Sequence, residues 1–185
     1  MQKNPSGLSA GNGERVITPP LGVELSGYGF YLERRAEGVL DDLKARAIVL
    51  SDGALRLALV GLDLVGLTVA FADGLRRDAA AALDIPCRNV LISCTHTHTG
   101  PATQPLRGIG EVDEAYMATL SGAVSAAVVA AARDMRGARL TFAAEAIEPI
   151  GYNRRKKNFD GIDPFLRAAR LARGGQGEGD IFLLN

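Results

Sequence analysis

The sequence predicts an α/β fold: a mixed sheet with a βαβ unit and helices packed on it. Three observations predict it. Two β-rich runs flank a Ser-Asp-Gly turn, a helix-forming segment joins the second run to another apolar strand, and a long helix rich in alanine and valine follows. With 185 residues and 47% hydrophobic side chains, the chain is long enough for one compact domain with a substantial core.

The N-terminal segment is polar and glycine-rich, so we expect residues 1–14 to form a flexible lead-in. Order is expected to begin near Arg15, and residues 15–185 are expected to make up the α/β domain. Residues 16–20 predict a short strand that ends at two prolines. The glycines of the loop at 26–29 either let the backbone approach another group closely or simply make a tight turn.

The next part of the chain predicts a hairpin and a helix. Residues 43–50 and 54–62 are β-rich, and the Gly of the turn between them supplies a positive φ, so we expect adjacent antiparallel strands. The second strand is mostly apolar, as is typical of a strand buried on both faces, and Asp63 follows its end. Thr68 can then cap a helix that continues to about Leu83.

An apolar strand at residues 89–93 leads directly into both histidines of the chain, His96 and His98. Because strand, helix and strand with short links form a βαβ unit, this strand is expected to lie parallel to the one before the helix. The carboxyl ends of both strands then meet at one edge of the sheet, where α/β proteins bind ligands. Asp63 is therefore expected near His96, either as a residue that orients it or as an ordinary turn residue.

The C-terminal part predicts one more helix and three strands. Residues 113–135 indicate a buried helix that covers the sheet, and residues 139–147 a strand. A basic loop follows at 151–157. Residues 165–171 are ambiguous between helix and strand, and we favour a hairpin in which they pair with residues 181–185 across a glycine-rich turn.

The two histidines are the strongest candidates for chemistry. Side chains at i and i+2 of an extended segment lie on the same face, so His96 and His98 can point into one pocket. Neutral imidazole is the commonest metal ligand, which favours a metal-assisted hydrolase; a hydrogen-bonded surface cluster is an equal alternative. Cys94 is expected to be a small apolar residue and no third ligand, because the series from Cys94 to His98 would extend roughly 13 Å.

Charge and composition argue against several classes of partner. Lys plus Arg and Asp plus Glu both number 21, so no net charge indicates a nucleic-acid or anionic-membrane partner. Two cysteines are too few for a disulfide framework, and we expect both to be reduced. No secretory signal and no apolar run of membrane-spanning length is visible, so we expect a soluble chain, cytoplasmic as given or secreted if a leader was removed. The oligomeric state is not predicted.

Several segments together resemble the N-terminal catalytic domain of the neutral/alkaline, non-lysosomal ceramidases. The most specific is Thr-His-Thr-His-Thr-Gly-Pro at residues 95–101. The others, in the same order along the chain, are residues 17–19, Gly27 with Tyr28, residues 43–49, the strand that ends at Asp63, residues 89–93, and Asn153 with Arg154. The resemblance extends over almost the whole part of the chain that we expect to be ordered.

The resemblance implies a zinc-dependent amidohydrolase that cleaves the amide of an N-acyl sphingoid base, a ceramide-like lipid, into fatty acid and amine. It implies that His96 ligates zinc and that His98 supports catalysis. It also implies that Gly27, Asn153 and Arg154 bind the substrate. This reaction needs a nucleophile at neutral pH and stabilisation of a tetrahedral intermediate, and bound zinc can supply both.

Asp63 is expected behind the histidines as a further catalytic residue. The family's other zinc ligands, a second histidine and then a glutamate and a tyrosine, are expected beyond Asn185, which makes the chain the incomplete N-terminal part of a larger domain. A histidine frequent in the family near residues 38–42 is absent, which leaves the substrate open. Two alternatives remain: a zinc hydrolase for another amide or ester, and a non-catalytic fragment that binds a partner through an unfinished sheet edge.

Overall fold

The computed structural model of the chain describes residues 7–29, 33–174 and 179–184. The chain divides into two compact units. Residues 10–136 form the first, and residues 137–185 together with the first nine residues form the second. A mixed sheet with helices packed on it confirms the predicted α/β class.

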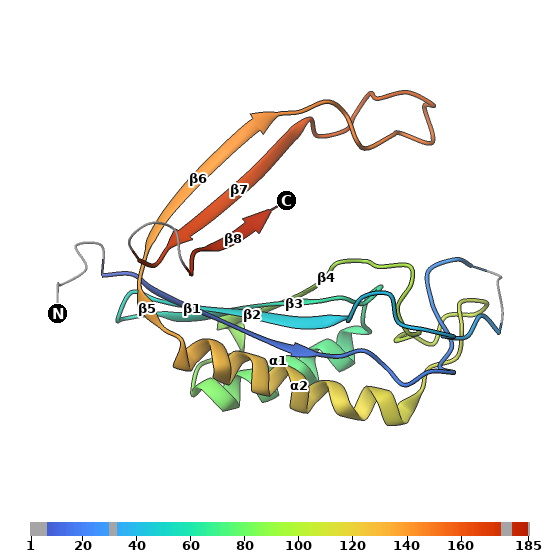
Figure 1. Cartoon of the computed structure of the whole chain (residues 1–185), viewed down its shortest axis with the longest axis horizontal. Coiled ribbons are helices and arrows are strands. Elements are labelled where there is room, and N and C mark those ends of the chain that lie inside the picture. The colour runs from blue at the N-terminus through green and yellow to red at the C-terminus, as the bar shows by residue number, and fades with distance from the viewer. Residues whose placement is uncertain (1–6, 30–32, 175–178, 185) are drawn as a thin grey trace. The chain divides into compact units, whose positions relative to one another are not determined.

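A five-stranded sheet in the order β4-β3-β2-β1-β5 underlies the first unit (Figure 1). Its strands are β1 (Ser9–Val16), β2 (Lys44–Ser51), β3 (Arg56–Leu62), β4 (Val90–Cys94) and the short β5 (Arg136–Gly137). Strands β2 and β3 are antiparallel and β3 and β4 are parallel, which confirms the predicted hairpin and βαβ unit. The carboxyl ends of β3 and β4 consequently lie at the same edge of the sheet.

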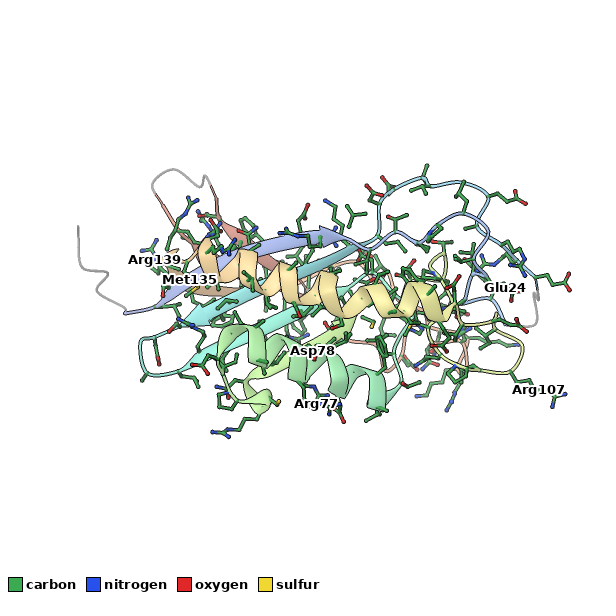
Figure 2. The ribbon with its side chains drawn as sticks, turned by 90° about the horizontal axis from the view of Figure 1, so that it is seen from below. Glu24, Arg77, Asp78, Arg107, Met135 and Arg139 are labelled. Carbon is green, nitrogen blue, oxygen red and sulfur yellow. The ribbon has the colours of Figure 1, made fainter. Side chains whose placement is uncertain are left out.

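Two helices lie side by side on one face of this sheet (Figures 1 and 2). Helix α1 (Val69–Leu83) links β3 to β4, and the side chain of Thr68 caps its first turn, as predicted. A single 3-10 turn (Cys87–Asn89) leads into β4. Helix α2 (Glu114–Arg133) is capped by the carboxylate of Asp113. Both caps satisfy amide groups that the helices cannot pair internally.

The hydrophobic core lies between the sheet and the two helices. Its fully buried members are aliphatic side chains from strands and helices, among them Val49, Val60, Leu62, Leu75, Leu120 and Val124. A polar contact also joins the helices: the hydroxyl of Ser121 donates to the carboxylate of Asp78 over 2.6 Å. Figure 2 shows Asp78 on α1 where the two helices meet.

Strand β3 is buried on one face only. Ala58, Val60 and Leu62 are buried, whereas the alternate residues Leu57 and Leu59 are half-buried. Both helices cover the same face of the sheet, so the prediction of a strand buried on both faces is wrong.

Strand β1 begins at Ser9, within the segment predicted to be a flexible lead-in. Its glycines allow close packing: a Cβ atom on Gly11 would lie 2.0 Å from the carbonyl oxygen of Ala131 in α2. The glycine-rich composition therefore reflects contact with a helix, and order begins before Arg15. Residues 1–6 of the expected lead-in lie outside the described residues.

Helix α2 is long and apolar enough, by length and composition alone, to cross a membrane, and it is the one such helix in the described part of the chain. The expectation that no apolar run reaches that length is thus corrected. Seven residues of α2 are buried, including Leu120 and Val128 of the core. A core helix meets the same criteria, so the finding is only a weak indication of a membrane span.

The second unit contains a three-stranded antiparallel sheet in the order β6-β7-β8. Its strands are β6 (Arg139–Ala146), β7 (Phe165–Ala172) and β8 (Ile181–Leu184). The pairing of β7 with β8 confirms the hairpin that the sequence favoured over a helix. Every residue of β6 is exposed, and the buried apolar side chains of β7 and β8 are Leu171 and Ile181.

Candidate functional site

Both histidines lie in the loop that follows β4. Backbone hydrogen bonds hold this loop against the segment after β3: the Thr95 amide donates to Leu62 over 2.9 Å and the His96 amide to Leu64 over 3.0 Å. His96 has a φ of 62°, in the left-handed region that costs free energy for any residue with a side chain. The segment is therefore not extended at His96, contrary to the prediction.

One hydrogen bond orients the imidazole of His96. Its Nδ1 lies 2.6 Å from the carbonyl oxygen of Val65. Because a carbonyl oxygen only accepts, this contact assigns the proton to Nδ1 and leaves the lone pair of Nε2 free. Metal-binding histidines are commonly held in this way, with the second ring nitrogen donating to a carbonyl or carboxylate.

His98 packs between two other rings. Its ring centroid lies 4.9 Å from that of His96, with 68° between the ring planes, and 5.5 Å from that of Tyr28, with 89° between the planes. The structure thus brings the two imidazoles together, as predicted. The left-handed turn at His96 achieves this, and not the alternation of an extended strand.

Gly27 makes the packing around His98 possible. It has a φ of 109°, and a Cβ atom built on it would lie 2.4 Å from the Cα atom of His98. Close approach of two backbones, and not merely a tight turn, therefore requires glycine here. Gly29 differs, because the described chain has no further atoms within 4 Å of its hypothetical Cβ.

Arg34 contacts the same cluster. Its Nη2 donates to the carbonyl oxygens of Ser26 and His98, over 2.6 and 2.9 Å, and its guanidinium carbon lies 4.8 Å from the centroid of the Tyr28 ring. Sequence patterns do not reveal this residue, since 64 positions separate it from His98.

Asp63 follows β3 at the edge of the sheet, as expected. Its Oδ2 accepts hydrogen bonds from the Lys44 amide over 3.0 Å and from Arg46 Nη1 over 2.8 Å. The group that orients His96 is the carbonyl of Val65, so a catalytic role of Asp63 remains a prediction.

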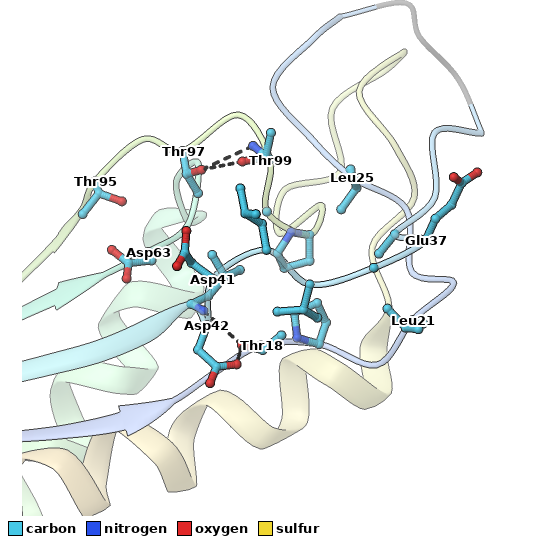
Figure 3. A pocket seen from close by; sticks show the side chains of 18 of the residues that line it. Thr18, Leu21, Leu25, Glu37, Asp41, Asp42, Asp63, Thr95, Thr97 and Thr99 are labelled. Carbon is cyan, nitrogen blue, oxygen red and sulfur yellow. Dashed lines mark hydrogen bonds between the residues drawn. The ribbon is translucent and has the colours of Figure 1, made fainter.

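A cavity of about 580 Å³ lies beside the threonines of the histidine loop (Figure 3). Its lining combines apolar side chains with hydroxyl and carboxylate groups, of which the labelled ones include Thr18, Glu37, Asp41, Asp42, Asp63, Thr95, Thr97 and Thr99. The hydroxyl of Thr18 donates to Asp42 over 2.8 Å. The cavity thus presents hydroxyl and carboxylate groups, with no imidazole in its lining.

Asn153 and Arg154 lie in the second unit. The Oδ1 of Asn153 accepts from the Arg155 and Lys156 amides, both over 3.1 Å, and its Nδ2 donates to the carbonyl oxygen of Asp160 over 2.8 Å. Asn153 therefore organises the basic loop, and Arg154 is exposed on it. Their role in binding substrate remains a prediction.

Most of the chain matches the model of one protein family. The family model for neutral/alkaline non-lysosomal ceramidase, N-terminal, matches residues 9–164. The chain belongs to this family. The matched region of this ceramidase-family chain begins at the first residue of β1 and includes the histidine loop and Asn153 with Arg154.

Two solved structures have a similar fold. Neutral ceramidase from Pseudomonas aeruginosa superposes with a TM-score of 0.75 at 22% sequence identity, covering 92% of this chain and 30% of that one. A ceramidase complexed with C2 gives a TM-score of 0.74 at 22% identity, covering 95% and 30%. The chain thus spans about 30% of the length of these proteins. No curated protein sequence matches it.

The described residues of this ceramidase-family chain fit one part of a zinc site. His96 offers a free Nε2 beside a second imidazole. Burial raises the pKa of the Cys94 thiol, as is typical of a partly buried cysteine that packs as a small apolar residue. Catalytic zinc normally takes three protein ligands, and no cluster of three His, Cys, Asp or Glu side chains occurs in the part of the chain that the structure describes.

Proposed function

We propose that this chain is the N-terminal part of a zinc-dependent amidohydrolase of ceramidase type, which cleaves an N-acyl sphingoid base into fatty acid and amine. Family membership supports a ceramidase-like hydrolase. The observation that carries the proposal is the hydrogen bond from His96 Nδ1 to the Val65 carbonyl, because it prepares Nε2 to bind a metal ion.

His96 would hold zinc through Nε2, together with ligands from outside the described cluster. When bound, zinc lowers the pKa of a water molecule and polarises the amide carbonyl. His98 would hold or transfer a proton at the amide nitrogen, because the amine that leaves has to gain one. Its edge contacts with His96 and Tyr28 restrict its ring to one orientation.

The remaining site residues would act on the substrate or on the sheet edge. Arg154 offers a planar fork of N–H donors to a carbonyl or hydroxyl group of the substrate, and Asn153 shapes the loop that presents it. Gly27 keeps the space beside His98 free of a side chain. Asp63 would act as a further catalytic residue behind the histidines, at the edge of the sheet where its carboxylate accepts from the Lys44 amide.

The test compares variants of the intact, zinc-loaded protein, with an N-acyl sphingoid base as substrate. His96→Asn is the informative change, since asparagine tolerates the left-handed backbone of His96 but removes the imidazole. We expect zinc affinity and hydrolysis to fall on the order of 100-fold or more. Cys87→Ser is the control, because it removes an exposed thiol outside the histidine loop, and it should change neither quantity.

Wild-type zinc binding by His96→Asn would contradict the proposal. Screening N-acyl lipids against short acyl amides and esters distinguishes a ceramidase from a zinc hydrolase with another substrate, because pocket shape selects the acyl chain. A zinc-free protein without hydrolytic activity would favour the non-catalytic alternative.

A further inference from the structure

We propose that Arg34 is a positioning residue that holds His98 in its working orientation, through the His98 carbonyl and through the ring of Tyr28. This inference rests on the proposed function only in assuming that His98 takes part in catalysis. The positioning involves the side chains of Arg34, Tyr28 and His98, and it can be measured without substrate.

Arg34 contacts His98 first through the backbone. Nη2 of Arg34 donates to the carbonyl oxygens of both Ser26 and His98. The Ser26 amide in turn donates to the carbonyl oxygen of Gly100 over 2.9 Å. The guanidinium of Arg34 therefore links the loop that contains Ser26 to the loop that contains His98. Hydrogen bonds from a charged donor are stronger than those between neutral groups, so this link is a firm one.

Arg34 also contacts His98 indirectly, through the ring of Tyr28. The guanidinium carbon of Arg34 lies 4.8 Å from the centroid of Tyr28, within the range of a cation–π interaction. The Tyr28 ring meets the His98 ring edge-on at 5.5 Å. Tyr28 thus lies between Arg34 and His98, and loss of the guanidinium would remove the contact that holds the Tyr28 ring against His98.

One buried atom of the half-buried Arg34 side chain indicates that this residue does not serve stability alone. Its Nε is buried and has no hydrogen-bond partner among the described atoms, which costs free energy. The backbone of the Arg34 segment is paired independently of this side chain, since the Leu25 amide donates to the Arg34 carbonyl over 2.8 Å. Local rules are broken in this way most often at functional sites.

The neighbouring Arg35 provides a matched control. It has the same side chain and lies on the same segment, but it contacts other groups. Its Nη1 donates to the Gly22 carbonyl over 2.8 Å, and its Nη2 pairs with Glu24 over 2.9 Å. Arg35→Ala therefore removes an arginine from this loop without touching Tyr28 or His98.

The experiment is proton–nitrogen NMR of the imidazoles in the 185-residue chain. The chain has two histidines, so two ring systems appear, and His98→Gln assigns them. In Arg34→Ala we expect the His98 ring signals to move toward those of a free histidine, because the ring loses its contact with Tyr28. His96 should keep its Nδ1-protonated pattern, which depends on Val65 and reports that the fold is intact. Arg35→Ala should leave both ring systems unchanged.

Unchanged His98 signals in a folded Arg34→Ala protein overturn the proposal. If Arg34→Ala also loses the His96 pattern, its fold is disturbed, and Arg34→Lys then serves as the test variant. Lysine keeps the charge, but its one ammonium nitrogen cannot both bond the two carbonyls, as Nη2 of Arg34 does, and lie over the Tyr28 ring, as the guanidinium carbon does. Displaced His98 signals in Arg34→Lys support the proposal, and unchanged signals overturn it.

Kinetics of the intact zinc-loaded protein separate this inference from the proposed function. We expect Arg34→Ala to lower kcat on the order of 10- to 100-fold, with KM and zinc affinity nearly unchanged and partial rescue by Arg34→Lys. Wild-type kcat in a folded Arg34→Ala protein overturns the inference. If the His98 signals move but the wild-type protein hydrolyses no N-acyl amide, the positioning stands and the proposed function fails.

Discussion

The strained backbone conformation of a single residue, His96, is stabilised by hydrogen bonds to the segment that follows β3. A left-handed conformation costs roughly 1–3 kcal/mol for a residue with a side chain. The His96 amide and Nδ1 both donate to carbonyl groups just after β3, those of Leu64 and Val65. Since β3 and β4 are parallel, the segment after one strand supplies the acceptors for the loop after the other. The orientation of the imidazole therefore depends on the strand pairing.

Tyr116 is a second residue whose single hydrogen bond has a measurable effect. Its hydroxyl donates to the carbonyl of Ile17 over 2.8 Å, and its side chain is buried. Tyr116→Phe removes the hydroxyl donor and leaves the Ile17 carbonyl without this hydrogen bond. We therefore expect the free energy of unfolding to fall by about 1 kcal/mol. Urea unfolding measures the change. The control is Tyr152→Phe, whose ring is half exposed and which should alter stability by less than about 0.5 kcal/mol.

The hydroxyl of Tyr116 should also make the stability of the protein depend on pH. Burial raises the pKa of Tyr116 above the ordinary tyrosine value of about 10. The folded state then holds the proton more tightly than the unfolded state, so the stabilisation is complete below pH 10 and is lost as the pH rises beyond it. Above about pH 10, the wild type should lose stability more steeply than Tyr116→Phe. Parallel stability curves for the two proteins would contradict this assignment.

The candidate site was predictable from sequence only in part. Spacing selected His96 and His98, and the need for close backbone approach was one of two interpretations of Gly27. Arg34 and the carbonyl of Val65 were not predictable. Both act through backbone carbonyl groups, which every residue type carries, and Arg34 reaches its partner across 64 positions.

At the scale of elements, capping residues, turn residues and β-rich runs were enough to predict most of the fold. The cap at Thr68, the turn between β2 and β3 and the strand before the histidines all occur as expected. The first strand was predicted at residues 16–20 but β1 is Ser9–Val16, because Gly11 and Gly13 are typical of mobile segments. In the structure they let the strand lie directly on the backbone of α2, and such contact between distant segments leaves no local pattern.

This contact between β1 and α2 predicts the effect of adding one methyl group. In Gly11→Ala, the new Cβ would lie 2.0 Å from the Ala131 carbonyl oxygen, which belongs to helix backbone and has little freedom to move. We expect a destabilisation of roughly 1–3 kcal/mol. Gly122→Ala is the matched control within α2, since no other atoms of the described chain lie within 4 Å of its Cβ. There, alanine should stabilise the helix by about 0.5–1 kcal/mol.

Urea unfolding of the two glycine variants gives the comparison directly. Opposite signs of the stability change are expected from the same Gly→Ala replacement, because one site is crowded by helix backbone and the other is open. A Gly11→Ala protein as stable as the wild type would show that β1 does not rest on α2.

At the scale of the whole molecule, burial is divided unequally between the two units. The aliphatic core cluster lies entirely within residues 17–131, in the first unit. Among the described residues of the second unit, the buried apolar side chains are Ala138, Leu171 and Ile181, whereas Phe142 is 77% exposed. Since buried apolar surface is the main source of stability, the two sheets should differ in how readily they open.

Hydrogen exchange of the 185-residue chain tests this difference. Strands β2 and β3 form an antiparallel ladder of seven residue pairs, and β6 and β7 form one of eight. β6 is an edge strand whereas β2 is paired on both sides, so the comparison is restricted to the amides that bond β6 to β7 and β2 to β3, for which backbone hydrogen bonding alone would predict similar protection. All of β6 is exposed, whereas β2 packs on α2, so we expect these bonded amides of β6 to exchange at least about tenfold faster, a difference of about 1.4 kcal/mol in opening free energy. Equal protection of β2 and β6 would show that the two units open together as one cooperative structure, in which case burial within each unit does not decide their stability.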